Sequence, residues 1–116
     1  MAERVPWSRW EYITSPREVG REPGLYAIRF CSAIVYIGSS SNLRSRLSTY
    51  PIWPDSERPR CAPWSIYFDD RHELEVCVSG SRRAGDWLMR EYRLVRRIMP
   101  RHNTHHVRRM EVPVGR

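Results

Sequence analysis

Two short runs of strand-forming residues, 24–30 and 34–37, are the feature that most restricts how this chain can fold. Both runs are rich in β-branched and aromatic side chains, and only residues 31–33 separate them. Two such runs joined by so short a connection are typical of a β-hairpin. The sequence therefore predicts an antiparallel strand pair at the centre of the fold.

The length of the turn decides which side chains of this hairpin share a face. A three-residue turn at 31–33 would pair Phe30 with Ile34 and Ile28 with Tyr36. Tyr26 and Tyr36 would then lie on the same face, about one step apart along the ladder. A four-residue turn would break that parity, so the shared face is predicted only for the shorter turn.

The rest of the chain predicts three helices and two strands. Ser15 is expected to cap a first short helix, with Pro16 in its first turn. The last strand alternates cleanly, so Leu74, Val76 and Val78 should face inward. Helices are predicted at 15–19, at 43–50 and from 82 to about 99, and strands at 65–68 and 73–78.

A carboxylate interrupts the apolar stripe of the long helix. Glu91 stands one turn after the first apolar pair, where another core residue is expected. Burying a carboxylate is costly unless it is paired or bound to a metal ion, so Glu91 is either a metal ligand or the partner of an arginine. The apolar positions are Trp87, Leu88, Leu94, Val95 and Ile98, and the basic face carries Arg90, Arg93, Arg97 and Arg101.

The charge balance favours a polyanionic partner. The 116 residues include 20 basic and 13 acidic side chains, a net charge of +7, and every basic residue is Arg. Arginine presents a planar fork of donors that grips phosphate in a bidentate manner. A small, strongly basic domain of this kind is typical of nucleic-acid binding, although solubility alone is the alternative reading.

A proline-rich segment at 51–64 is long for a plain connection, which makes it either functional or mobile. It carries Arg58 and Arg60 beside Trp53 and Trp64. These two indoles would either stack on unpaired bases or anchor the loop to the core.

Cysteine usage and the chain start indicate a reducing, cytoplasmic (intracellular) location. No Cys-x-x-Cys pattern is present, and Cys31 and Cys77 lie in apolar runs, so both are expected to be buried free thiols. No apolar run is long enough for a membrane span, and residues 1–7 lack the apolar core of a signal peptide. His102, His105 and His106 fit no common zinc spacing.

Two tripeptides and the residues downstream of them resemble the GIY-YIG endonuclease domain family. Gly24-Leu25-Tyr26 and Tyr36-Ile37-Gly38 are ten residues apart from tyrosine to tyrosine. The family pattern continues with an arginine ten residues after the second tyrosine, a Tyr or His one turn later, a helical Glu and a Pro-x-x-Asn element. Here these positions are Arg46, Tyr50, Glu91, Pro100 and Asn103, and the resemblance covers about residues 22–106 of a single domain, 1–116.

The resemblance implies an α/β (α+β) fold, a small central antiparallel or mixed sheet flanked by helices. It also implies hydrolysis of DNA phosphodiester bonds with one divalent ion, magnesium or manganese. Glu91 would hold the metal and Arg46 the scissile phosphate. Tyr26 or Tyr36 would orient and deprotonate the attacking water, and Tyr50 would contact phosphate or relay a proton. Asn103 would be a polar anchor of the site.

The basic residues expected to contact the DNA backbone lie on the helices and in the proline-rich segment. They are Arg44, Arg58, Arg60, Arg90, Arg93, Arg97 and Arg101. One position departs from the family, because Ser39 stands where many members have lysine. The alternatives are a non-catalytic nucleic-acid-binding module and a partner-activated subunit of a repair or recombination complex. Targeting would come from the 51–64 loop, from a homodimer or from a partner protein.

Overall fold

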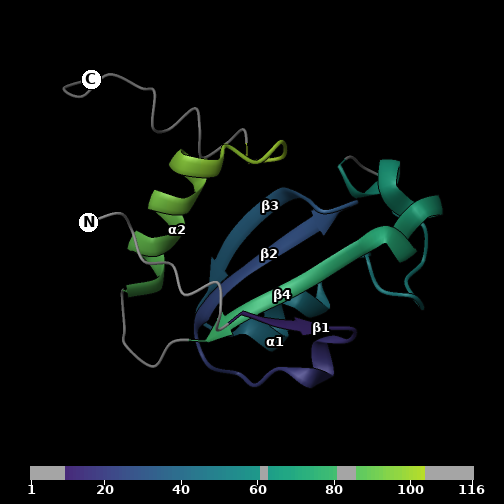
Figure 1. The fold of residues 1–116 in the computed structure, drawn as a ribbon. Coiled ribbons are helices and arrows are strands. Elements are labelled where there is room, and N and C mark those ends of the chain that lie inside the picture. The colour runs from purple at the N-terminus through teal and green to yellow at the C-terminus, as the bar shows by residue number, and fades with distance from the viewer. Residues whose placement is uncertain (1–9, 61–62, 81–85, 104–116) are drawn as a thin grey trace.

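A four-stranded antiparallel sheet forms the centre of the computed structural model, which describes residues 10–60, 63–80 and 86–103 (Figure 1). The strand order is β1-β4-β2-β3, and each neighbouring pair runs antiparallel. This sheet with its flanking helices confirms the predicted fold class. The strands are β1 (Glu11–Ile13), β2 (Gly24–Phe30), β3 (Ala33–Ser40) and β4 (Leu74–Gly80).

Strands β2 and β3 form the predicted hairpin, but its turn has two residues instead of three. Cys31 and Ser32 both have positive φ, at 50° and 73°. Positive φ at both central positions is the geometry that matches the twist of a two-residue hairpin. Phe30 consequently pairs with Ala33, so the predicted pairing of Phe30 with Ile34 is wrong. Cys31 is exposed at the tip of the turn, which corrects its prediction as a buried thiol.

A β-bulge restores the register farther along the hairpin. The pairing shifts between Ile28 and Arg29, so that Ile28 lies opposite Tyr36 as predicted. A bulge places two residues of one strand opposite one residue of the other, which resets the side-chain parity. Tyr26 and Tyr36 therefore lie near each other, with ring centroids 6.1 Å apart.

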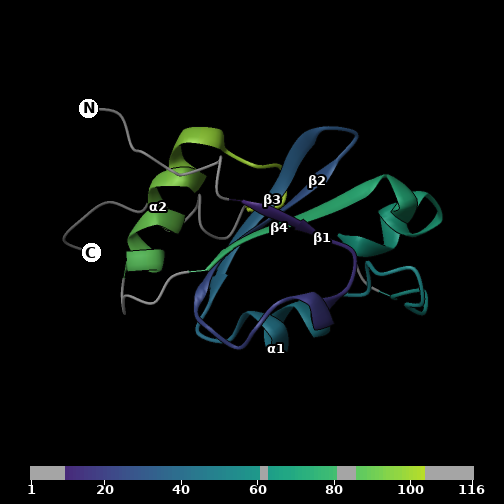
Figure 2. The ribbon, with the colours of Figure 1, turned by 60° about the horizontal axis from the view of Figure 1, so that its bottom comes forward.

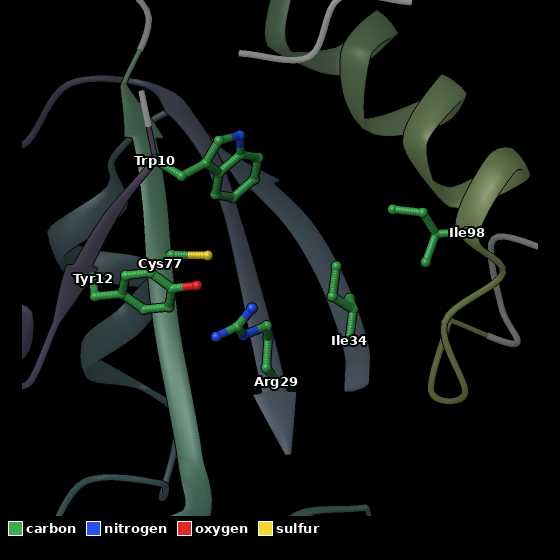
Figure 3. Close-up of a pocket in the computed structure, with 6 residues that line it drawn as sticks. All are labelled: Trp10, Tyr12, Arg29, Ile34, Cys77 and Ile98. Atoms are coloured by element: carbon green, nitrogen blue, oxygen red, sulfur yellow. The ribbon is translucent and has the colours of Figure 1, made fainter. Parts of the chain in front are cut away.

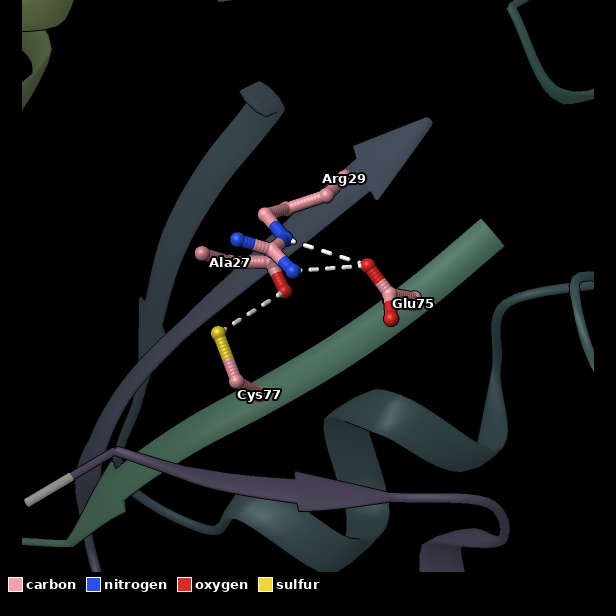
Figure 4. Close-up of polar contacts among 4 residues, drawn as sticks. All are labelled: Ala27, Arg29, Glu75 and Cys77. Atoms are coloured by element: carbon pink, nitrogen blue, oxygen red, sulfur yellow. Dashed lines mark hydrogen bonds and ion pairs between the residues drawn. The ribbon is translucent and has the colours of Figure 1, made fainter. Parts of the chain in front are cut away.

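Strand β2 is the central element because it pairs with β3 on one side and β4 on the other. A cross-strand ion pair links β2 to β4, because Arg29 lies opposite Glu75 and donates a hydrogen bond to it at 2.8 Å (Figure 4). Two residues earlier on β2, the Ala27 carbonyl accepts a weak hydrogen bond from the Cys77 thiol at 3.8 Å. Cys77 is a buried free thiol, as predicted.

Helical elements cover both faces of the sheet, with α1 and α2 on opposite sides (Figure 2). One face, with Tyr26 and Ile28, packs against α1 (Leu43–Ser48) and the 3-10 helix η3 (Trp64–Glu73). The other face packs against α2 (Asp86–Ile98). Its core consists of Trp10, Leu25, Ala27, Ile37, Cys77, Leu94 and Val95.

The strand predicted at 65–68 is wrong, because this segment belongs to the 3-10 helix η3. Trp64 and Tyr67 are its buried residues, and a spacing of three places them on one side of a helix with three residues per turn. The other short elements agree with prediction. Ser15 accepts a hydrogen bond from the Arg17 amide at 3.2 Å and caps η2 (Pro16–Glu18). Asn42 caps α1 in the same way.

The predicted stripes on β4 and α2 are confirmed in their central parts. Val76, Val78, Leu94 and Val95 are buried, whereas Leu74 is half-buried at the start of its strand. Leu88 is 53% exposed, so its assignment to the apolar face is wrong. Residues 82–85, which the sequence assigned to the long helix, lie outside the described residues, as do Cys61, His105 and His106. Within the described ranges, no helix has the length and apolar character needed to cross a membrane.

The segment after α2 is fastened to the free edge of β3 by one side chain. Asn103 is 1% exposed, and its amide makes two hydrogen bonds with the backbone of Ile37. Its Oδ1 accepts from the Ile37 N–H at 2.9 Å, and its Nδ2 donates to the Ile37 carbonyl at 2.8 Å. The side chain thus satisfies the two outward backbone groups of an edge residue.

Replacing Asn103 with alanine leaves these two groups buried without partners. We expect Asn103→Ala to lower the free energy of unfolding by about 3 kcal/mol, because each orphaned group costs about 1–3 kcal/mol. Urea unfolding followed by tryptophan fluorescence measures the change. Asn42→Ala, which removes only a helix cap, is the control and should cost about 1 kcal/mol. A smaller loss for Asn103→Ala than for the control would contradict this role.

Candidate active site

Three tyrosine rings meet on the face of the sheet that packs against α1. Tyr26 lies in β2, Tyr36 in β3, and Tyr50 just after α1. The Tyr50 ring centroid lies 5.7 Å from that of Tyr26 and 6.2 Å from that of Tyr36. The hydroxyl oxygens of Tyr26 and Tyr50 are 2.6 Å apart, a hydrogen-bond distance. The structure therefore brings together the three tyrosines that the sequence selected.

The glycine of the second tripeptide makes room for this cluster. Gly38 pairs with Tyr26 across the β2–β3 ladder. A Cβ atom at Gly38 would lie 2.4 Å from both Cζ and the hydroxyl oxygen of Tyr26. Only glycine allows the Tyr26 ring to lie across β3 in this position, which gives the motif glycine a packing reason.

Arg46 lies on α1 beside this cluster, close enough for its guanidinium and the Tyr26 hydroxyl to shift each other's pKa. The nearness of the Tyr26 hydroxyl raises the pKa of Arg46 above its usual value. Burial raises the pKa of Tyr26 to about 12, although the hydrogen bond with Tyr50 and the nearby Arg46 act in the opposite direction. Burial also raises the pKa values of Tyr36 and Tyr50. All three hydroxyls are therefore protonated at neutral pH.

Glu91 lies on α2 and reaches the same region from the other side of strand β3. Its side chain is buried, with 6% exposure, which confirms the position predicted from the apolar stripe. Its negative charge contributes to the raised pKa of Tyr36, so the carboxylate and the tyrosine cluster share one electrostatic environment. The Ser39 hydroxyl donates a hydrogen bond to Glu91 Oε1 at 2.5 Å.

Ser39 is the site residue that sequence reasoning missed. Its position, three residues after the second tyrosine, stood out only because lysine is common there in the family that this chain resembles. The contact with Glu91 joins residues 52 positions apart in the chain, so no local pattern could have predicted it.

Aromatic residues of η3 form a wall beside the tyrosines. The Trp64 ring meets Tyr50 edge-on, with centroids 5.6 Å apart, and meets Tyr36 at 6.0 Å. Trp53 is also buried, and its indole N–H donates to the Leu47 carbonyl at 2.9 Å. These contacts show that both tryptophans anchor their segment to the core. Tyr67 continues the wall with a 2.6 Å hydrogen bond to His102.

The donor set fits a hard divalent cation better than zinc. Among the described residues, no three His, Cys, Asp or Glu side chains gather in a way that could hold a metal ion. A lone carboxylate such as Glu91 suits a cation that takes most of its ligands from water and phosphate oxygens, as Mg²⁺ does.

The arginines predicted to contact DNA fall into two groups. Arg44 and Arg58 are engaged within the protein, because Arg44 Nε donates to the Val19 carbonyl at 2.7 Å and Arg58 forms an ion pair with Asp69. The guanidinium of Arg58 also lies over the Phe68 ring, 4.6 Å from its centroid. Arg44 and Arg90 are half-buried, and the exposed members of the set are Arg58, Arg60, Arg93, Arg97 and Arg101.

A hollow of about 460 Å³ lies on the opposite face of the sheet and contains none of the predicted site residues (Figure 3). Its thiol, Cys77, is poorly suited to chemistry, because burial raises its pKa to about 11. The lining residues are Trp10, Tyr12, Arg29, Ile34, Cys77 and Ile98.

Comparison with solved structures assigns this architecture to a class of nuclease domains. The fold matches the GIY-YIG N-terminal endonuclease domain of UvrC from Thermotoga maritima. One tyrosine-to-phenylalanine mutant of it, bound to its catalytic divalent cation, superposes with a TM-score of 0.55 at 20% identity, covering 76% of this chain and 94% of that chain. A second such mutant gives a TM-score of 0.53 at 22% identity, over 76% and 93% of the two chains. This chain therefore has the GIY-YIG fold, as the resemblance predicted.

The spacing of the mutated tyrosines in those structures agrees with the cluster described above. Three of the mutants replace tyrosines that are ten and fourteen residues apart in succession. Tyr26, Tyr36 and Tyr50 have the same spacing. No protein-family model and no curated protein matches this chain.

The buried position of Tyr26 predicts a late titration. The difference in absorbance at 295 nm between the parent and Tyr26→Phe should develop with a midpoint of about pH 12, not near the ordinary tyrosine pKa of about 10. Because the folded-state pKa is raised, the neutral hydroxyl stabilises the fold below about pH 10, and this contribution is lost as the pH rises through about 12. A midpoint near pH 10 would contradict the described burial.

Proposed function

We propose that this protein is a metal-dependent endonuclease that hydrolyses phosphodiester bonds in DNA. The observation that carries the proposal is the cluster of Arg46 with the Tyr26–Tyr50 hydroxyl pair, together with a buried carboxylate, Glu91, whose charge acts on the third tyrosine, Tyr36. Hydrolysis of a phosphodiester needs a cation on the phosphate, an oriented water and a group that accepts its proton. Residues for each of these tasks lie in one place.

Glu91 would hold the divalent cation, and its single carboxylate suits Mg²⁺ or Mn²⁺. When bound, such an ion polarises the phosphate oxygens and stabilises the charge that develops on them. The catalytic divalent cation of the structurally similar UvrC domain supports this assignment.

Arg46 would bind the scissile phosphate. Arg46 is exposed, and its guanidinium lies close enough to the Tyr26 hydroxyl to interact with it. A fixed guanidinium donates charge-assisted hydrogen bonds to phosphate and favours the transition state, in which negative charge grows on the oxygens.

The tyrosines would divide the handling of water between them. The phenolate of Tyr26 is favoured by the hydrogen bond with Tyr50 and by the nearby positive charge of Arg46, whereas the charge of Glu91 opposes ionisation of Tyr36. We therefore assign proton acceptance to Tyr26 and orientation of the water to Tyr36. Tyr50 is half-buried and links the hydroxyl of the buried Tyr26 to the solvent side.

The DNA backbone would lie across the exposed arginines of α2, of the 51–64 segment and of the segment after α2. Arg60, Arg93, Arg97 and Arg101 are exposed on the surface, in a chain with a net charge of +7. Contacts of this kind neutralise phosphates and provide affinity, but they carry no direct sequence information.

Replacing Glu91 with glutamine tests the metal assignment. Glu91→Gln keeps the size of the side chain and removes its charge, so Mg²⁺-dependent nicking of supercoiled plasmid should fall at least about 100-fold. Binding of a labelled duplex, measured by fluorescence anisotropy in EDTA, should stay within about twofold of the parent, because the backbone contacts remain. Cleavage at the parent's rate would overturn the role of Glu91. A parent that binds DNA but never cuts it would favour the non-catalytic module.

Replacing Arg46 with alanine tests the phosphate contact. The maximal rate of Arg46→Ala should fall about 10²–10³-fold, the usual loss when one preorganised donor to a developing oxyanion is removed. Arg21→Ala, a change at an exposed arginine outside the site, is the control and should keep the parent's rate. If thermal unfolding shows that Arg46→Ala does not fold, Arg46→Lys becomes the informative variant. It keeps the charge without the planar fork and should still cut more slowly. Cutting at the parent's rate by a folded Arg46→Ala would exclude this role.

A further inference from the structure

A serine hydroxyl contacts the candidate metal ligand directly. Ser39, near the end of β3, donates to Glu91 Oε1 at 2.5 Å, and the carboxylate is only 6% exposed. A hydrogen bond to a buried carboxylate is stronger than one between neutral groups. Neither the phosphate contact nor the handling of water proposed above uses this bond.

The meeting of these two residues follows from the packing of β3 against α2. Side chains two residues apart on a strand share a face, so Ser39 faces α2 together with Ile37. On the helix, Glu91 lies one turn before Leu94 and Val95, which pack in the same cluster as Ile37. The polar contact of Ser39 with Glu91 therefore lies next to the apolar contact of Ile37 with Leu94 and Val95.

The position of Ser39 is fixed from the outer side of β3 as well. The two hydrogen bonds from the Asn103 amide hold the backbone of Ile37, two residues away. The serine backbone itself is paired with β2, opposite Leu25. The hydroxyl therefore belongs to a rigid part of the fold, which is what the orientation of a ligand requires.

A hydroxyl at this place orients the carboxylate without neutralising it. A glutamate side chain has three rotatable bonds, and a hydrogen bond to one oxygen restricts all of them. Because the partner is neutral, the carboxylate keeps its full negative charge for a cation. Partners of this kind that hold a metal ligand commonly change metal affinity 10–100-fold when removed.

We propose that Ser39 is a positioning residue for Glu91 and that it sets the affinity of the site for its divalent cation. The proposal rests on the metal-dependent activity proposed above. In this role Ser39 acts through its hydrogen bond to Glu91. Its effect is therefore on metal binding and not on the chemical step at saturating metal.

Metal binding without DNA is the direct test. Free Mn²⁺ is measured by electron paramagnetic resonance during titration of the parent, Ser39→Ala, Ser39→Thr and Ser48→Ala. We expect Ser39→Ala to weaken Mn²⁺ binding about 10-fold or more, because the orienting partner is lost. Ser39→Thr keeps the hydroxyl and should restore binding to within about threefold of the parent. The Ser48 hydroxyl donates to the Arg44 carbonyl and has no part in the site, so Ser48→Ala is the matched control and should bind like the parent.

The dependence of plasmid nicking on Mn²⁺ separates positioning from a structural role. For Ser39→Ala, the Mn²⁺ concentration at half-maximal rate should rise by the same factor as the dissociation constant, while the maximal rate stays within about twofold. A lower maximal rate at saturating Mn²⁺, or the loss of a cooperative thermal unfolding transition, would indicate a structural role and overturn the proposal. So would equal Mn²⁺ affinities of Ser39→Ala and the parent, and in that case the nuclease activity would stand. A parent that neither binds Mn²⁺ nor nicks DNA would overturn both proposals.

Discussion

The two hydrogen bonds between the Asn103 amide and the backbone of Ile37 hold the parts of this molecule in their relative positions. Strand β3 and α2 come from distant parts of the chain, and an apolar contact alone has little directional preference. The amide supplies that preference, because a buried side chain with 1% exposure must satisfy both of its polar groups and those of Ile37 at once. The places of Glu91 and Ser39 relative to each other depend on this connection. It also explains why an asparagine far from the tyrosines in sequence belongs to the same motif.

The candidate site is unusual in its electrostatics, because its best-ordered polar groups are neutral at physiological pH. Burial keeps the tyrosines protonated, and the charges that bear on them are Arg46 at one end and Glu91 at the other. In a region of low polarity these two charges act over a longer range than in water. A phosphate and a divalent cation entering between them would complete the charge balance that the protein leaves open. Under the proposed function, substrate binding would change the pKa values of the buried hydroxyls.

Much of the fold and of the candidate site could be predicted from the sequence, since the signals were local. Strand-forming runs predicted β2 and β3, the stripe predicted the burial of Glu91, and motif spacing selected residues that do meet. The errors arose where tertiary contacts decide. The two-residue turn depends on positive φ at Cys31 and Ser32, and neither cysteine nor serine is a residue type that indicates positive φ. The bulge then compensates for the change in register that this short turn causes. The segment at 65–68 has strand-forming side chains, but the burial of Trp64 and Tyr67 on one side requires a helix. The contact between Ser39 and Glu91 could be recognised only once the packing of β3 on α2 was known.

The two edge strands of the sheet, β1 and β3, differ in length and in how their free backbone groups are covered. Strand β1 has three residues, and β3, the longer edge, is closed at Ile37 by Asn103 and at Val35 by the amide of His102. Open strand edges invite pairing with other chains, which leads to aggregation. Here the segment that completes the site also shields the longest edge from such pairing. Loss of that segment would therefore also expose a template for intermolecular β-structure, in a chain with an already apolar hairpin.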